Sequence, residues 1–208
     1  KKTGSVKAYT GACYADFLPL DIDSEDLSES DETARRILMN LQDKYGLDLK
    51  TLRVSFSGAK GFHIEIPAGI FGFQPSPILP KILKAMAEKI IPDGVTIDTA
   101  IYGKSRLWRL PNTVNSKSGL YKIRLTAAEV FNLRVDEIRE LAKQPRKGVF
   151  YDPNVELNPA LNKLYMECKA EVGTSLNGGL SNKSKQIGDK KYKAFLRNGV
   201  GEAGGMQL

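Results

Sequence analysis

The feature that most constrains the fold is a glycine-containing turn between two short apolar stretches, in the sequence VSFSGAKGFHIEIP of Val54–Pro67. The flanking segments Arg53–Phe56 and Phe62–Ile66 are rich in aromatic and β-branched residues, which favour strands. A short turn between two such strands predicts an antiparallel hairpin. Alternation along the second strand then places His63 and Glu65 on one face and the apolar side chains on the other.

The residues of this turn also offer groups that could bind a ligand. Its glycines, Gly58 and Gly61, are expected to let the backbone approach a ligand closely. Ser57 adds a small hydrogen-bond donor and Lys60 adds a fixed positive charge. His63, the only histidine in the chain, follows directly. A plain hairpin with a surface histidine is the alternative for this stretch taken alone.

The overall composition is that of a globular protein. The chain has 208 residues, enough for one large domain or two small ones with a real core. Hydrophobic residues make up 41% and charged residues 26%, which are ordinary globular values. The formal net charge of +7 favours a polyanionic partner.

Several classes of protein are disfavoured. Cys13 and Cys168 lie far apart and belong to no Cys/His cluster, which argues against a zinc site and favours a reducing compartment. The sequence has no apolar run long enough for a membrane span and no signal-peptide core. We therefore expect a soluble, cytoplasmic protein with no membrane partner. Because the chain begins at Lys1 rather than at Met, we also expect other domains in a longer parent chain.

The segment Asp16–Glu32 contains eight acidic residues and no Lys or Arg. Phe17–Ile22 is predicted to be a strand, so that Asp21 and Asp23 share one face while Ile22 points to the core. Two convergent carboxylates repel each other, and a divalent cation such as Mg²⁺ or Mn²⁺ relieves that repulsion. An acidic strand end that leads into a helix cap is the alternative.

Two amphipathic helices are predicted around the hairpin. Ser28 or Ser30 is expected to cap the first, which runs to about Tyr45 and ends at Gly46. The second is expected over residues 77–91, after a proline-rich connection. The chain between them is the predicted hairpin, so the pattern is one of mixed helices and strands.

A short strand, Val95–Ile97, is predicted to end in Asp98. The segment Tyr102–Leu125 that follows is wholly basic, with six cations and no acid: Lys104, Arg106, Arg109, Lys117, Lys122 and Arg124. Its last residues, Leu120–Leu125, are predicted to form a strand. Because these cations follow an aspartate closely, we expect them to hold a triphosphate or a nucleic-acid backbone beside metal ions. A solvated basic face is the alternative.

The remainder of the chain is predicted to be helical and then irregular. Short helices are expected over Thr126–Phe131, which opens with a capping box, over Val135–Lys143, and over Pro159–Val172. Glycine and basic residues dominate from Gly173 onward. We therefore expect one domain of residues 1–172, followed by a linker or mobile tail of residues 173–208.

Three motifs occur in order: Asp21-x-Asp23, the turn from Ser57 to His63, and Ile97-Asp98 with its basic continuation. Together they resemble the archaeo-eukaryotic primase superfamily, over about Phe17 to Leu125. The chain is more similar to primase-polymerases of mobile elements and CRISPR-associated systems than to replicative small subunits. The resemblance implies an α+β fold with an RRM-like antiparallel sheet beside an αβ unit, and a catalytic domain over residues 1–172.

The resemblance also implies roles for individual residues. It implies that two catalytic metal ions, Mg²⁺ or Mn²⁺, are held by Asp21, Asp23 and Asp98. It implies that the triphosphate of the incoming nucleotide contacts the turn, at Ser57, Gly58, Lys60, Gly61 and His63. It implies that triphosphate or template charge is neutralised by Arg106 and Arg109, and it matches Lys117 to the lysine of a KTGL-like turn.

Two tyrosines and three departures complete the comparison with the superfamily. Tyr14 and Tyr102 are both placed where an aromatic side chain senses a 2′-hydroxyl, and both are candidate sugar contacts. Replicative relatives often carry a second basic residue where Ala59 stands and a histidine where Asn115 stands. They also carry a zinc module, for which this chain has no ligands.

We therefore predict a template-dependent nucleotidyltransferase, a primase-polymerase that adds dNTPs or NTPs to a 3′-hydroxyl on a single-stranded DNA template with a primer. Both primer initiation and primer extension are compatible with the sequence. One alternative is a metal-dependent nuclease or phosphohydrolase, although no second histidine or activating base is available. The other is a non-catalytic RRM-like nucleic-acid-binding module, which gives no reason for three aligned aspartates.

Overall fold

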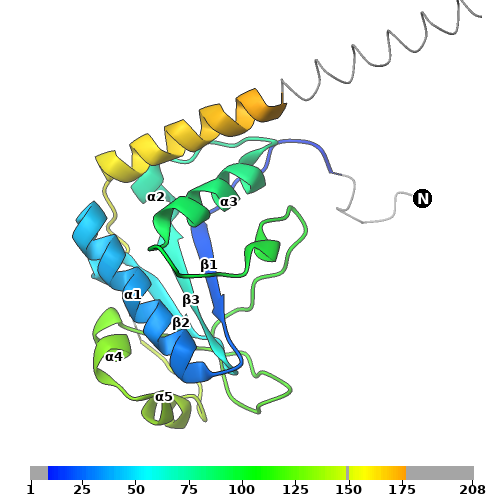
Figure 1. Ribbon diagram of the computed structural model, residues 1–208. Coiled ribbons are helices and arrows are strands. Elements are labelled where there is room, and N and C mark those ends of the chain that lie inside the picture. Colours follow the sequence, from blue (N-terminus) through cyan, green and yellow to red (C-terminus); the bar gives the residue numbers. More distant parts are fainter. Residues whose placement is uncertain (1–8, 149, 177–208) are drawn as a thin grey trace, which may run out of the picture. The chain divides into compact units, whose positions relative to one another are not determined.

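The computed structural model describes residues 9–148 and 150–176. The chain divides into two compact units, Lys1–Lys169 and Ala170–Leu208. The first unit contains a four-stranded antiparallel sheet in the order β1-β3-β2-β4 (Figure 1). Its strands are β1 (Phe17–Asp23), β2 (Arg53–Phe56), β3 (Gly61–Pro67) and β4 (Ile123–Leu125). The predicted α+β class and the β2–β3 hairpin are confirmed.

Two helices cover one face of this sheet, and Figure 1 shows both in front of the strands. The labelled helices of the first unit are α1 (Leu27–Tyr45), α2 (Ala68–Phe71), α3 (Leu79–Ile90), α4 (Ala127–Asn132) and α5 (Val135–Leu141), with single 3₁₀ turns η1 (Leu49–Thr51) and η2 (Thr99–Ile101), and residues 159–169 form a further helix. The apolar stripes of α1 and α3 are buried, as are the even-numbered residues of β1 and β3, among them Ile22 and Ile64. The core therefore lies between these helices and one face of the sheet.

The start of α1 differs from the prediction that Ser28 or Ser30 caps it. Asp26 is the N-cap residue, and its carboxylate accepts a hydrogen bond from the Ser28 N–H at 2.8 Å. Ser30 lies a turn inside the helix, where its hydroxyl donates to the Lys60 carbonyl at 2.8 Å. This bond ties α1 to the hairpin turn. Gly46 ends the helix in the left-handed conformation, with φ of 62°, as predicted.

The predicted strand Val95–Ile97 is wrong. A strand needs a ladder of backbone bonds, whereas this segment is joined to the sheet by one bond, from the Asp98 N–H to the Asp21 carbonyl at 2.9 Å. β4 is also shorter than the predicted Leu120–Leu125. The Tyr121 and Lys122 N–H groups donate to Ala142 and Thr113 carbonyls instead, at 2.8 Å and 2.9 Å. These bonds turn the chain away from β2 before β4 begins.

Residues 159–169 of the first unit are helical, where the sequence predicts a helix. Leu161, Tyr165 and Cys168 of this helix are buried. In the second unit, the described residues 170–176 are also helical. Most of the predicted tail, residues 177–208, lies outside the described residues. Within the described ranges, no helix has both the length and the apolar character needed to span a membrane.

Candidate functional site

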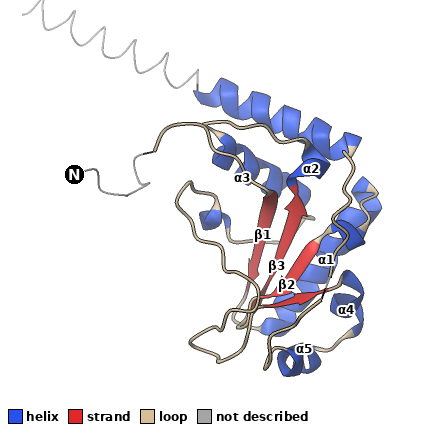
Figure 2. Cartoon of the chain, turned by 180° about the vertical axis from the view of Figure 1, so that it is seen from behind, coloured by secondary structure: helices blue, strands red, loops and turns tan. Residues whose placement is uncertain are grey.

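The face of the sheet opposite α1 and α3 carries a row of polar side chains. The strand register sets Asp21 opposite His63, His63 opposite Ser55, and Ser55 opposite Arg124. Because side chains alternate along each strand, all four point away from the core. Figure 2 shows β1 and β3 from this side, with α1 and α3 beyond them. The row therefore crosses all four strands on the face that the helices leave open.

His63 is held tightly within this row. Its side chain is only 11% exposed, and its ring packs against Trp108, with 4.3 Å between the ring centroids and an angle of 35° between the ring planes. The Lys122 ammonium lies 2.8 Å from Nδ1, and Asp21 Oδ1 lies 3.4 Å from Nε2. An ammonium group has only donors, so Nδ1 must accept and the ring proton must stand on Nε2, toward Asp21. The alternative of a surface histidine is therefore wrong.

His63 is a neutral imidazole at neutral pH. Burial, followed by the charges of Lys122, Arg109 and Arg124, lowers the pKa of its ring to about 3. Because the ring is neutral, the approach of His63 Nε2 to Asp21 Oδ1 at 3.4 Å is not an ion pair. Nε2–H is the group that His63 offers to an acceptor at the open face.

Lys122 lies at the centre of the site. The sequence placed it among six cations expected to hold phosphates, and it gave Lys122 no role of its own. It is fully buried, donates to the Arg109 carbonyl at 2.7 Å, and lies 4.9 Å from the centre of the Trp108 ring. Burial lowers the pKa of its ammonium to about 8, and neighbouring Glu65 acts in the opposite direction. The sequence did contain a signal, because Lys122 and Arg124 stand two apart beside a predicted strand and so share a face.

Glu65 is a buried carboxylate that joins three of these groups. Trp108 Nε1 donates to its Oε1 at 2.9 Å, and Arg124 donates to its Oε2 at 2.9 Å. Lys122 Nζ lies 3.7 Å from Oε1. A buried carboxylate is stable only when its charge is paired and its oxygens accept hydrogen bonds. Glu65 therefore fixes Trp108 and, through it, the ring of His63.

The three predicted aspartates lie close together at the C-terminal end of β1. The backbone bond from Asp98 to Asp21 brings the third aspartate beside the first. Burial, followed by the charges of Asp23 and Asp98, raises the pKa of Asp21 to about 6. The pKa of Asp23 is also raised, mainly by burial. Bound cations would relieve the repulsion between these three carboxylates, and carboxylate oxygens are ligands that suit Mg²⁺ and Mn²⁺.

The Asp21 side chain is 21% exposed and that of Asp23 is 48% exposed, so both remain accessible to a ligand. In the part of the chain that the structure describes, no group of three or more His, Cys, Asp or Glu side chains has the arrangement of a metal site. The carboxylates fit divalent cations by their chemistry and by their mutual repulsion, and not by a preformed cage.

The glycines of the turn approach the chain's own backbone. A Cβ on Gly61 would lie 2.1 Å from the Ile22 carbonyl oxygen, and one on Gly58 would lie 3.0 Å from the Leu120 carbonyl oxygen. Gly58 also has a φ of +87°. The Ser57 hydroxyl accepts a hydrogen bond from the Gly61 N–H at 3.2 Å. Ser57 and both glycines therefore shape the turn, and packing within the chain already explains why glycine stands at 58 and 61.

The cations predicted to contact phosphates lie around the same turn. Lys60 Nζ lies 2.5 Å from Glu25 and 3.8 Å from Asp23, so its charge stands beside the aspartates. Arg109 donates to the Ser57 carbonyl at 3.4 Å. Lys117 lies in an exposed turn whose neighbouring Ser118 donates to the Gly58 carbonyl. The turn that resembles KTGL is therefore docked on the hairpin turn.

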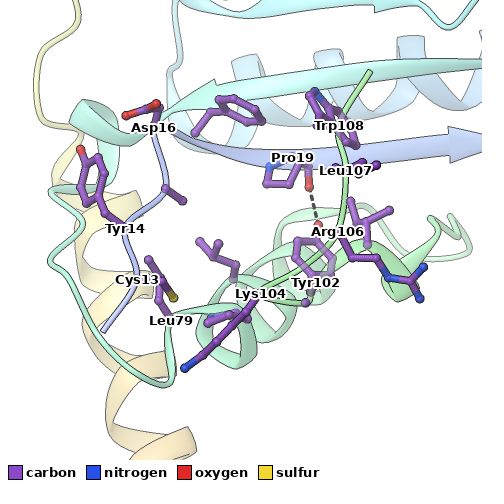
Figure 3. A pocket seen from close by; sticks show the side chains of 16 residues that line it. Cys13, Tyr14, Asp16, Pro19, Leu79, Tyr102, Lys104, Arg106, Leu107 and Trp108 are labelled. Carbon is purple, nitrogen blue, oxygen red and sulfur yellow. Dashed lines mark hydrogen bonds between the residues drawn. The ribbon is translucent and has the colours of Figure 1, made fainter. Parts of the chain in front are cut away.

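A pocket of about 210 Å³ lies between the start of β1, the start of α3 and the loop after η2 (Figure 3), and none of the three aspartates lines it. Tyr14 and Tyr102, the two candidate sugar contacts, both line it, together with Arg106 and Trp108. Tyr102 is the buried one of the pair. Its hydroxyl donates to the Pro19 carbonyl, and burial holds its pKa above the usual range. Pockets for drug-sized ligands hold about 300–1,000 Å³, so this one suits a single ring system.

A scan against protein-family models finds no matching family, and a search of curated proteins finds no match. The function is therefore argued from the residues of the site.

Proposed function

We propose that this chain is a template-dependent nucleotidyltransferase of the primase-polymerase kind, which adds dNTPs or NTPs to a 3′-hydroxyl. The observation that carries the proposal is the convergence of Asp21, Asp23 and Asp98 beside His63 on the open face of the sheet. Three carboxylates beside a fixed N–H donor and nearby cations match what phosphoryl transfer requires.

The order of the elements supports the same proposal. Strand, helix, two strands, helix and strand follow one another, and helices cover one face of an antiparallel sheet. This is the arrangement of RRM-like sheets, which present their open face to nucleic acid. Two differences are that β4 pairs with β2 and that Asp98 lies beside β1. An RRM-like catalytic core is accordingly part of the proposal.

Two divalent cations, Mg²⁺ or Mn²⁺, held by Asp21, Asp23 and Asp98 would lower the pKa of the attacking hydroxyl and stabilise charge on the phosphates. His63 would donate its Nε2–H to a phosphate oxygen, with its direction set by Lys122. Lys60 and Arg109 would neutralise the charge of the triphosphate. The ring-sized pocket would take the sugar or base, with Tyr14 and Tyr102 as its aromatic contacts.

The state of His63 argues against hydrolysis with histidine as the general base. Its Nδ1 already accepts a hydrogen bond from Lys122, and its Nε2 already carries the proton. Neither ring nitrogen is free to take a proton from water at neutral pH. This favours transfer to a hydroxyl over a nuclease or phosphohydrolase that depends on a histidine base.

Primer extension tests the proposal directly. The protein is incubated with a labelled primer annealed to a template, with dNTPs or NTPs in separate reactions, and with Mg²⁺, Mn²⁺ or EDTA. We expect longer, template-directed products that disappear with EDTA and return when Mn²⁺ is restored. A phosphohydrolase would shorten the primer or release phosphate, and a binding module would leave the primer unchanged. Either result would contradict the proposal.

Lys60 offers a second test, because its charge stands beside Asp23. Lys60→Ala should weaken nucleotide binding by roughly tenfold to a hundredfold, as expected for one charged contact to phosphate. Single-stranded DNA binding should change little. Lys84→Ala is the matched control, since both lysines are about half exposed and each pairs with one glutamate. Isothermal titration with nucleotide and with DNA measures both, and equal losses for both ligands would contradict a specific triphosphate contact.

A further inference from the structure

The loop between η2 and β4 exposes large aliphatic side chains. Leu107 is 97% exposed, Leu110 is 69% exposed and Val114 is 50% exposed. Leu107 is the most exposed large hydrophobic residue in the described ranges. Water-exposed aliphatic side chains that cluster in one loop are typical of a contact surface. The loop follows Asp98 in the sequence, and its Trp108 packs against His63 on the open face of the sheet.

The exposure of the two leucines follows from contacts that hold the residues between them. Trp108 stands between Leu107 and Leu110 and turns inward, because its Nε1 donates to Glu65 and its ring packs against His63. The Arg109 carbonyl accepts from buried Lys122 at 2.7 Å. With the backbone held at these points, the side chains on both sides of Trp108 point to solvent.

Further along the loop, Asn112 and Arg146 exchange two hydrogen bonds, each of 2.9 Å. Ser118 donates to the Gly58 carbonyl. The loop is therefore attached to the hairpin turn and to the segment after α5 as well as to the sheet. Its apolar side chains are presented by an anchored backbone.

All the charged residues of this loop are basic. No acidic residue occurs from residue 99 to residue 128. Four exposed cations stand among the aliphatic side chains, namely Lys104, Arg106, Arg109 and Lys117. Among the residues that the structure describes, none of the four forms an ion pair. A partner that complements this loop must be anionic and must also offer apolar surface.

We propose that Leu107, Leu110 and Val114 contact the bases of a single-stranded nucleic acid whose phosphates are held by the loop's cations. Single strands expose base faces beside a regular line of phosphates, whereas a duplex buries those faces. Aliphatic side chains such as leucine are used in proteins to contact or part stacked bases. Because Trp108 of this loop contacts His63, a nucleic-acid strand bound along the loop would extend toward the aspartates. This inference rests on the proposed function and identifies the template surface for it.

The test compares aliphatic and arginine variants by fluorescence anisotropy with a labelled, mixed-sequence single-stranded DNA at several salt concentrations. Leu110→Gln combined with Val114→Gln, neither of which lines the ring-sized pocket, should weaken binding roughly tenfold and leave the salt dependence unchanged, because aliphatic side chains release no counterions. Arg106→Gln combined with Arg109→Gln should weaken binding and also reduce the salt dependence. Met39→Gln combined with Met166→Gln is the control, since both methionines are about half exposed elsewhere in the first unit.

Nucleotide titration separates this inference from the proposed function. The variant of Leu110 and Val114 should bind nucleotide like the wild type and extend primers less efficiently at low DNA concentration. DNA binding equal to that of the methionine control would overturn the inference and leave the proposed function standing. Loss of binding to phosphatidylserine vesicles without loss of DNA binding would also overturn it, in favour of a membrane surface. A wild-type protein that extends no primer would instead contradict the proposed function.

Discussion

Asp21→Asn is expected to lower primer extension by more than about 100-fold, because groups that merely orient a metal ligand already contribute 10–100-fold. The same loss is expected for Asp98→Asn, which stands beside Asp21 through a backbone bond that the substitution leaves in place. The amide keeps the shape of the carboxylate and removes the charge that would attract a cation.

The fold should survive the Asp21 substitution. Burial and the neighbouring charges raise the pKa of Asp21 to about 6, above its ordinary value of 3.8. The ionised carboxylate therefore destabilises the folded state, and this effect grows as the pH rises from about 4 through 6. At pH 7 the asparagine variant should melt at the same temperature as the wild type or higher, as measured by circular dichroism.

Asp43→Asn on the exposed face of α1 is the matched control for charge and should extend primers normally. Retention of full extension by the Asp21 variant would contradict the role of this carboxylate. A marked fall in melting temperature would contradict the account of its repulsion with Asp23 and Asp98.

Lys122→Met is expected to release the ring of His63. Without the ammonium, Nδ1 loses its donor, and the preference for the tautomer protonated on Nε2 should weaken or reverse. The Arg109 carbonyl also loses a bond, and Glu65 loses a cation at 3.7 Å. We expect stability to fall by about 2–4 kcal/mol, and extension to fall roughly tenfold to a hundredfold.

Nitrogen NMR of the ring measures the tautomer without any ligand. The chain contains one histidine, so protein labelled with ¹⁵N-histidine gives a single pair of ring-nitrogen signals. At neutral pH the wild type should show a protonated Nε2 and an unprotonated Nδ1. Lys117→Met, an exposed lysine of the same loop, should leave both signals in place.

Lys122→Gln keeps one N–H donor and gives a folded comparison where the methionine variant is too unstable. It should retain more of the Nε2-protonated form than methionine does. Ring signals that stay the same in both Lys122 variants would show that Lys122 does not hold the tautomer.

Local pattern in the sequence was enough to predict β1, β2 and β3 and the faces of their residues, but not β4. β2 spans Arg53–Phe56 as predicted, and β1 extends the predicted Phe17–Ile22 by one residue. Asp21 lies on the open face while Ile22 is buried. The capping box that opens α4 is also present. These features depend on neighbours within a few residues, so period-two alternation and cap residues are sufficient evidence for them.

The contacts between the polar groups of the candidate site could be learned only from the tertiary structure. Lys122 was predicted to be one of six cations that hold phosphates, and it is buried against His63, which stands 59 residues earlier. Asp98 was predicted to end a strand, and one backbone bond places it beside Asp21 instead. Gly61 was expected to approach a ligand, and it approaches the Ile22 carbonyl. Each outcome depends on strand register and loop packing between distant segments, and no local pattern of residue types encodes those contacts.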